Sequence, residues 1–204
     1  MKKRVRVWAA GVSLALSSLL SVSSAQAAPV VYGFDSLQDG AHVVNQLAGL
    51  SFANAQALKA GQSLNEFEFP PRSGDTAVFD DGGALEILFA QGVYSVGAYF
   101  TYVEGLSFLA YDAGGNLLGT SSSLFDTNLL TSGEAGSQVN EFIGWSDSSG
   151  RIARVVIQGS GQGASLVMDD LTVDFGRTVP EPQTWTLVLL ALASAGLARR
   201  RLFN

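Results

Sequence analysis

One acidic side chain in the last predicted strand lies where it needs a chemical partner. The segment Ser165–Phe175 alternates as a strand does, and the alternation puts Asp169 on an otherwise apolar face. The apolar members of that face are Val167, Leu171, Val173 and Phe175. A carboxylate among core side chains is costly unless it is paired. The sequence therefore predicts a partner for Asp169, either a bound Ca²⁺ or several backbone N–H groups.

Two further acids lie where they could share the same ion. Asp170 follows Asp169 directly, and Asp35 ends the first predicted strand, Val30–Asp35. The first and last strands of a jelly roll often lie near each other, so Asp35, Asp169 and Asp170 form a candidate site for Ca²⁺. Two alternatives remain open: a β-bulge that turns Asp169 outward, and a hydrogen bond from Asp169 to a loop.

Other residue combinations that carry catalytic chemistry are sparse. The chain has no cysteine, which excludes thiol catalysis and thiolate metal sites, and His42 is its single histidine. No G-x-S-x-G motif is present, so neither a serine triad nor a zinc site is predicted. No spacing selects a pair of acids for glycoside hydrolysis, and the acidic segment Asp80–Gly83 predicts a solvated turn. The sequence therefore predicts no catalytic residues.

Aromatic side chains are numerous enough for a core and for a sugar-stacking surface. Most must be core, because a sandwich of this size needs large side chains. In the predicted strand Val93–Val103, Tyr99 and Thr101 share one face, and Phe100 and Tyr102 share the other. One of these faces is a candidate exposed platform. The aromatic candidates are Phe79, Phe89, Tyr94, Tyr99, Phe100, Tyr102, Phe108, Tyr111, Phe142 and Trp145.

Short β-like runs closed by turn residues recur along residues 28–176 and must position these side chains. About ten such runs predict an all-β fold, a single jelly-roll-like β-sandwich, with one possible helix around Gln56–Lys59. Two hairpins are predicted, around Ala113–Gly115 and around Asp147–Gly150. The second would join the strands Val139–Ser146 and Arg151–Gln158. In addition, Ala84–Ala90 is predicted to face Val93–Val103 across Gln91-Gly92.

The net charge of residues 28–176 limits the classes of partner that this domain can bind. Residues 28–176 carry 17 acids and four cations, Lys59, Arg72, Arg151 and Arg154, a net charge of −13. So acidic a domain argues against nucleic acid and anionic lipid, and it suits an extracellular module and divalent cations. The length is enough to bury a core without disulfides.

The N-terminal segment 1–27 has the three parts of a secretory signal peptide. Lys2, Lys3, Arg4 and Arg6 come first, an apolar run follows to Leu20, and small residues end at Ala25-Gln26-Ala27. This A-x-A pattern predicts cleavage after Ala27. The following domain is therefore expected to cross the inner membrane.

The C-terminal segment 177–204 also has three parts. Val179, Pro180, Glu181 and Pro182 precede an uncharged apolar run, 185–198. As a helix this run would span roughly 21 Å, short of a hydrocarbon core of about 30 Å. The basic cluster Arg199, Arg200 and Arg201 follows and should stay cytoplasmic. A short transmembrane helix that inserts transiently is therefore expected.

These three C-terminal features in this order resemble the PEP-CTERM sorting tail. The resemblance covers Val179 to Asn204 and implies a Gram-negative envelope. It implies processing by an exosortase that recognises the Pro-Glu-Pro segment. It further implies an association with exopolysaccharide and biofilm. Such a tail indicates where a protein is sorted and not what it does, because the domains that precede it are diverse.

The middle domain resembles galactose-binding-like jelly-roll modules. The residues that carry this resemblance are Tyr32–Asp35, Tyr111–Asn116, Gly144–Ser146 and Met168–Val173. In such modules an ion held by these acids is usually structural. The expected function is a non-catalytic module at the cell surface or in the extracellular matrix that contacts carbohydrate or supports the matrix. The alternatives are a polysaccharide hydrolase or lyase, and a scaffold without a specific ligand.

Overall fold

The computed structural model describes residues 28–176, which form eleven strands. The strands are β1 (Val30–Tyr32), β2 (Leu50–Ala53), β3 (Ala55–Lys59), β4 (Thr76–Asp80), β5 (Leu85–Val93), β6 (Ser95–Tyr102), β7 (Ser107–Tyr111), β8 (Leu117–Ser122), β9 (Glu141–Ser146), β10 (Ile152–Gln158) and β11 (Leu166–Asp174). Residues 1–27 and 177–204, with the predicted signal peptide and sorting tail, lie outside this range. Within residues 28–176, no helix has both the length and the apolar character to cross a bilayer.

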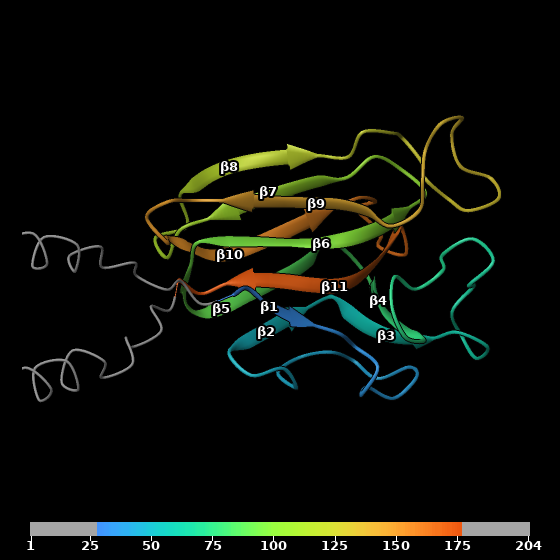
Figure 1. Cartoon of the computed structure of the whole chain (residues 1–204), viewed down its shortest axis with the longest axis horizontal. Helices are drawn as coiled ribbons and strands as arrows, with labels where there is room; N and C mark the ends of the chain where they lie inside the picture. Colours follow the sequence, from blue (N-terminus) through green and yellow to red (C-terminus); the bar gives the residue numbers. More distant parts are fainter. Residues whose placement is uncertain (1–27, 177–204) are drawn as a thin grey trace, which may run out of the picture. The chain divides into compact units, whose positions relative to one another are not determined.

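The strands form two antiparallel sheets that lie one over the other (Figure 1). The six-stranded sheet has the order β3-β4-β11-β6-β9, with β1 also pairing to β11. The five-stranded sheet has the order β2-β5-β10-β7-β8. The predicted all-β sandwich is thus confirmed as a two-sheet antiparallel sandwich.

The core lies between the sheets and follows the period-2 alternation of the strands. In β6, Val96, Ala98, Phe100 and Tyr102 point inward and are at most 2% exposed. Phe100 meets Phe108 of β7 edge to face, with ring centroids 6.4 Å apart. The alternation therefore leaves Tyr99 on the outer face of the six-stranded sheet.

Strand β11 departs from simple alternation because it contains a bulge. Leu166 and Met168 are buried before the bulge, and Leu171 and Val173 are buried after it. The register against β6 shifts between Asp169 and Thr172, and Asp170 has a left-handed φ of +47°. The prediction that Asp169 shares a face with Leu171 and Val173 is therefore wrong. Asp169 lies opposite Tyr99, on the outer face.

Local turn signals predicted one hairpin correctly and two strand pairings wrongly. The strands predicted on either side of Gln91-Gly92 correspond to β5 and β6, which belong to different sheets and do not pair. β7 pairs with β8 around Ala113–Gly115, as predicted. In contrast, β9 pairs with β6, whereas β10 pairs with β5 and β7. The turn at Asp147–Gly150 therefore crosses between sheets. A turn signal marks where the chain reverses but not whether the next strand joins the same sheet.

The predicted helix around Gln56–Lys59 is also wrong, because these residues belong to strand β3. Ala55 and Ala57 alternate into the core, and β3 pairs along its whole length with β4. Burial of a period-2 face has overridden the weak helix propensity of this short run.

The outer face of the six-stranded sheet has a covered half and an open half. The segment between β3 and β4 folds over β4 and the first part of β11, where Leu64, Ala77 and Val167 form a small second core. Phe69 of this segment packs on the same cluster. The outer face of β6, β9 and the last part of β11 has no such cover and includes a groove.

Candidate functional site: an aromatic groove beside a carboxylate-held loop

The open half of the sheet is built from cross-strand pairs of β6 and β9. Ser95 lies opposite Ser146, Gly97 opposite Gly144, and Tyr99 opposite Phe142. Side chains at alternate positions of a strand share one face, so these pairs form adjacent rows on the outer face. Thr172 of β11 extends the glycine row from the other side of β6.

The glycine row forms the floor of a groove of about 360 Å³. A Cβ on Gly97 would lie 2.5 Å from the Phe142 ring, and one on Gly144 would lie 2.6 Å from the Val96 carbonyl oxygen. Only glycine leaves room for Phe142 to lean over the sheet here. The groove is lined by Ser95, Val96, Gly97, Phe142, Gly144, Trp145, Ser146 and Thr172.

Two aromatic rings and one guanidinium form a stack at the edge of this groove. Phe142 is 53% exposed, although its ring is large and apolar. Its ring meets that of Tyr99 edge to face, with centroids 5.2 Å apart at 64°. The guanidinium carbon of Arg72 lies 4.5 Å from the Tyr99 ring centroid on the ring face. Tyr99 thus joins Phe142 to the loop that carries Arg72.

That loop is held by the buried carboxylate of Asp169. The backbone N–H groups of Arg72 and Ser73 donate to Asp169 Oδ2 at 2.8 and 3.0 Å. The N–H of Asp170 donates to Asp169 Oδ1 at 2.7 Å. Asp169 is 2% exposed. The partner predicted for this carboxylate is thus present as backbone N–H groups, the second of the two possibilities.

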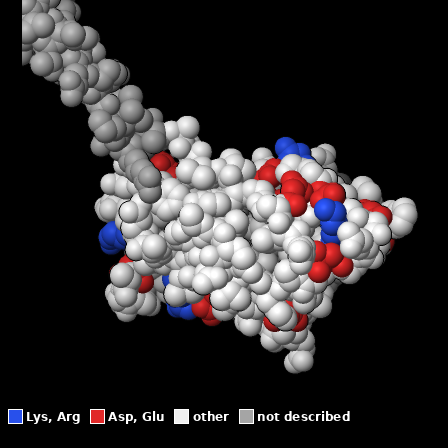
Figure 2. Space-filling model, turned by 90° about the horizontal axis from the view of Figure 1, so that it is seen from below, with Lys and Arg blue, Asp and Glu red and all other residues white. Residues whose placement is uncertain are grey.

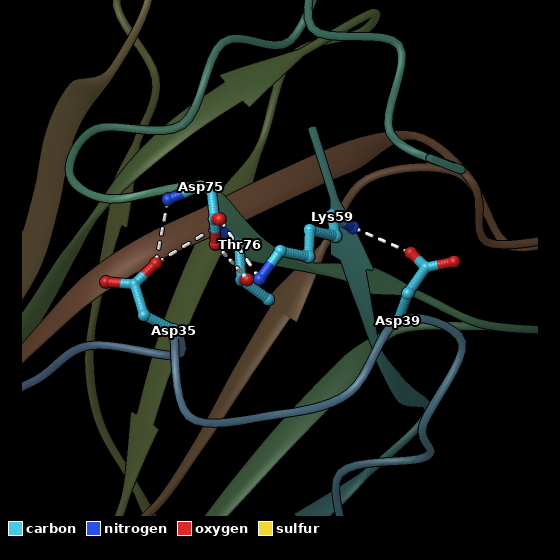
Figure 3. A network of polar contacts seen from close by, with 5 residues as sticks. All are labelled: Asp35, Asp39, Lys59, Asp75 and Thr76. Atoms are coloured by element: carbon cyan, nitrogen blue, oxygen red, sulfur yellow. Dashed lines mark hydrogen bonds and ion pairs between the residues drawn. The ribbon is translucent and has the colours of Figure 1, made fainter. Parts of the chain in front are cut away.

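The other two acids of the predicted calcium site contact the same loop. The Ser73 hydroxyl donates to Asp170 at 2.7 Å. The N–H groups of Asp75 and Thr76 donate to Asp35 Oδ1 at 2.8 and 3.1 Å (Figure 3). All three predicted acids therefore converge on residues 72–76, to which the structure ties them by hydrogen bonds.

Gly74 is essential to this arrangement. It has a left-handed φ of +56°, and a Cβ there would lie 2.1 Å from the Asp35 carboxylate oxygens. Both the backbone conformation and the close approach of Asp35 therefore require glycine.

Lys59 secures the far side of the loop. Its Nζ pairs with Asp75 at 3.0 Å, and its backbone N–H donates to Asp39 at 2.8 Å (Figure 3). The contact with Lys59 and the hydroxyl of Thr76 hold the pKa of Asp75 below its ordinary value. The Ser63 hydroxyl and the Lys59 N–H likewise lower the pKa of Asp39. Figure 2 shows charged side chains around the edges of the face it presents, with the largest group toward the right, and an uncharged middle.

Asp169 titrates differently from these exposed acids. Burial raises its pKa to about 6, against the opposing effect of the backbone N–H groups of Ser73, Asp170 and Arg72. The desolvation of the charge thus outweighs the hydrogen bonds that stabilise it.

The calcium hypothesis for Asp35, Asp169 and Asp170 stays a prediction. Within residues 28–176, no group of three or more His, Cys, Asp or Glu side chains is arranged to hold a metal ion. Each of the three carboxylates already accepts N–H or O–H donors from the loop. Such donors stabilise a carboxylate by hydrogen bonding instead of by a cation.

A second acid was misjudged from its sequence context. Asp80 was expected in a solvated turn, but it is fully buried. It accepts the N–H groups of Ser165 and Leu166 and the Ser165 hydroxyl. Burial raises its pKa. By contrast His42 is an exposed loop residue, with Nδ1 3.4 Å from Asp81.

Sequence reasoning missed the loop that joins the acids to the aromatic groove. Arg72 lies in Pro70-Pro71-Arg72-Ser73-Gly74, a run with no strand or helix period. The Pro-Pro and Ser-Gly pairs were a turn signal, but they carry no information about what the loop covers. The remaining predicted site residues, Ala27, Val179–Pro182 and Arg199–Arg201, lie outside the described range.

Residues 178–201 match the PEP-CTERM protein-sorting motif, which confirms the resemblance of the C-terminal tail. No curated protein matches the chain.

Among solved structures, the chain resembles the K2 cleaved adhesin domain of Lys-gingipain at 13% identity, over 72% of this chain and 99% of that one, with a TM-score of 0.46. It resembles a DUF4465 family protein from Bacteroides caccae at 11% identity, over 71% and 98%, with a TM-score of 0.47. It resembles the family 22 carbohydrate binding module of Clostridium thermocellum Xyn10B at 10% identity, over 74% and 95%, with a TM-score of 0.38.

At these identities and TM-scores, the likeness is one of general architecture and says nothing about a ligand. This chain therefore carries a β-sandwich domain followed in sequence by a PEP-CTERM protein-sorting motif.

Proposed function

We propose that the β-sandwich is a non-catalytic module that contacts carbohydrate through the groove on β6, β9 and β11. The observation that carries the proposal is Phe142, a large aromatic side chain that is 53% exposed beside a groove lined with hydroxyl groups. A half-exposed aromatic ring offers an apolar surface that the core does not use. Sugar rings present apolar C–H faces and polar hydroxyl edges, so one sugar unit could contact both the Phe142 ring and the groove hydroxyls.

The groove has the chemical character of a binding surface. Ser95, Ser146 and Thr172 supply hydroxyls, and the glycine row leaves the floor between them free of side chains. These hydroxyls can donate to and accept from sugar hydroxyls. The lining includes no acid and no histidine, so it offers contacts to a sugar rather than a general acid or base.

The sorting tail supports a second part of the proposal, the route. The PEP-CTERM motif at residues 178–201 implies processing by an exosortase. We propose export after cleavage at Ala27, transient insertion through 185–198, and release of the domain to the cell surface or exopolysaccharide matrix. The proposed domain limits are 28–176 for the sandwich and 177–204 for the tail. The sandwich is proposed to be a jelly roll, because within it only β3–β4 and β7–β8 pair as consecutive strands.

The binding proposal is tested on an array of neutral and acidic polysaccharides with purified protein. We expect wild-type protein to bind at least one polysaccharide and Phe142→Ala to weaken this binding by about tenfold or more. Phe67→Ala is the matched control, because Phe67 is an aromatic residue with 74% exposure on a loop. Equal binding by Phe142→Ala and wild type would refute the groove. Normal folding with no binding to any glycan would favour the scaffold alternative, and cleavage of a bound polysaccharide would favour the enzyme.

The route is tested through the intact mass of the protein in a strain that contains its exosortase. Replacing Glu181 or Pro182 should leave an unprocessed, membrane-retained chain. Identical masses and identical fractionation for wild type and variant would contradict the proposed processing.

A further inference from the structure

Arg72 differs from the other three cations of the domain. Lys59 pairs with Asp75, Arg151 with Asp147 and Arg154 with Glu86, at 3.0, 2.9 and 3.2 Å. In the part of the chain that the structure describes, the Arg72 guanidinium has no carboxylate partner; its contact is with the ring of Tyr99. Its five N–H donors are therefore available beside the groove.

The side chain is held in place from both ends. Its backbone N–H is fixed by Asp169, and its guanidinium rests on Tyr99, which in turn meets Phe142. A planar guanidinium stacked on a ring keeps its fork of N–H groups at its edge, where it can bridge two neighbouring acceptors. Arg72 is thus prepared to donate to a molecule that lies against Phe142.

The surrounding charge selects the kind of acceptor. Asp169 and Asp170 hold the same loop as Arg72, and Asp174 lies opposite Ser95 at the other end of the groove. The outer face around the groove therefore carries one positive charge and three carboxylates, in a domain of net charge −13. The negative charge would repel an anionic polymer, whereas it does not weaken the binding of an uncharged pair of hydroxyl groups.

We propose that Arg72 is a specificity-determining residue of the groove. It donates hydrogen bonds from its guanidinium to two adjacent hydroxyl oxygens of an uncharged sugar unit that packs on Phe142. This inference rests on the proposed carbohydrate function and names the class of its ligand, a neutral polysaccharide, in place of one that bears uronic acids.

The test measures the affinity of purified protein for neutral polysaccharides (galactan, xylan and mixed-linkage β-glucan) and for polygalacturonate. We expect binding to one or more neutral polymers that changes little between about 0.05 and about 0.5 M NaCl, because no charge is neutralised. Arg72→Ala should weaken it by about tenfold or more, and Arg72→Lys should weaken it nearly as much, because lysine lacks the fork. Arg154→Ala is the matched control and should bind as wild type.

Three outcomes would overturn the inference, and they separate it from the proposed function. If Phe142→Ala abolishes binding while Arg72→Ala does not, the groove stands and the role of Arg72 is wrong. The ligand is anionic if the protein binds polygalacturonate best, if this affinity falls as the salt concentration rises, and if Arg72→Lys retains it. If neither Phe142→Ala nor Arg72→Ala affects binding, both proposals fail.

Discussion

Each sheet has a tyrosine ring on which an arginine stacks, but only one of the two arginines also pairs with a carboxylate. On the five-stranded sheet, Arg154 lies 4.4 Å from the Tyr111 ring and also pairs with Glu86 at 3.2 Å. On the six-stranded sheet, Arg72 lies 4.5 Å from the Tyr99 ring and has no carboxylate partner within the described residues. The first stack satisfies its charge within one sheet, whereas the second leaves its donors beside a groove.

The two stacks also differ in what positions them. Arg154 and Tyr111 are direct cross-strand partners, as β10 and β7 are neighbours. Arg72 instead lies on a loop that must be held against the sheet by Asp35, Asp169 and Asp170. A strand pair comes from the regular ladder, but a loop over a sheet needs buried polar contacts. Release of the loop should therefore disturb the Arg72 stack and leave the Arg154 stack intact.

The largest expected effect is that of Gly74→Ala. The new Cβ would meet the Asp35 carboxylate at 2.1 Å, at a residue with φ of +56°. We expect a loss of about 3 kcal/mol in the free energy of unfolding and loss of carbohydrate binding. The matched control is Gly115→Ala, where φ is +81° but nothing lies within 4 Å. It should cost only about 1–2 kcal/mol. Similar costs in denaturant titrations would show that Asp35 does not clamp the loop.

The next effect is a pH dependence caused by Asp169. Its pKa is about 6 in the folded state, above the ordinary value of 3.8, so the native state keeps the proton to higher pH than the unfolded chain. The unfolding free energy should therefore fall as pH rises from about 4 to about 6, by on the order of 3 kcal/mol at most. Acids with lowered pKa, such as Asp75, lose their stabilising effect only as pH falls below about 4.

Asp169→Asn checks this assignment in denaturant titrations across the same range. An amide keeps only one of the two acceptor oxygens, so either the N–H groups of Arg72 and Ser73 or that of Asp170 lose their acceptor. The variant should therefore be less stable by about 1–3 kcal/mol. Its dependence on pH between about 4 and about 6 should be flatter than that of wild type, with the remainder due to Asp80. An unchanged slope would mean that Asp169 does not titrate there.

Calcium gives a further test of the same carboxylate. The hydrogen-bond arrangement predicts that the melting temperature of wild type is the same in chelator and in excess calcium. If the three acids hold Ca²⁺ instead, a free concentration about 100-fold above the dissociation constant adds roughly 2.7 kcal/mol. That would raise melting by several degrees, and Asp169→Asn should abolish most of the rise.

The smallest expected effect separates the two stacks by stability. Arg154→Ala removes both an ion pair and a stack on half-exposed side chains, and should cost about 1 kcal/mol. Arg72→Ala removes only an exposed stack and should cost about 0.5 kcal/mol. Thermal melts should thus rank the variants in the opposite order from their effects on binding. A larger loss for Arg72→Ala would mark it as a structural residue.

Much of the fold could be predicted from the sequence because the alternation that marks a strand is a local pattern. Alternation identified β6 and its two faces, and the turn at Ala113–Gly115 identified the β7–β8 hairpin. Sheet membership could not be predicted in the same way. The turn at Asp147–Gly150 joins strands of different sheets, which depends on burial of both faces and not on the turn.

The candidate site could be predicted only in part. The acids Asp35, Asp169 and Asp170 were singled out by their place on the first and last strands, and they do converge. Their shared target, the loop around Gly74, has no periodic signal. The bulge at Asp170 reversed the assumed face of Asp169, because one inserted residue changes the side on which every later residue lies. Arg72 therefore entered the site only through the folded structure.

The most direct test of the groove is to map the bound sugar by NMR amide shifts. Purified wild-type protein is titrated with a neutral oligosaccharide taken from the best-binding polysaccharide. The groove predicts that the largest shifts cluster at Gly97, Phe142 and Gly144, with a further shift at Arg72. Shifts centred on the five-stranded sheet around Arg154, or no shifts at saturating sugar, would contradict the central claim that the open face of β6 and β9 is the binding surface.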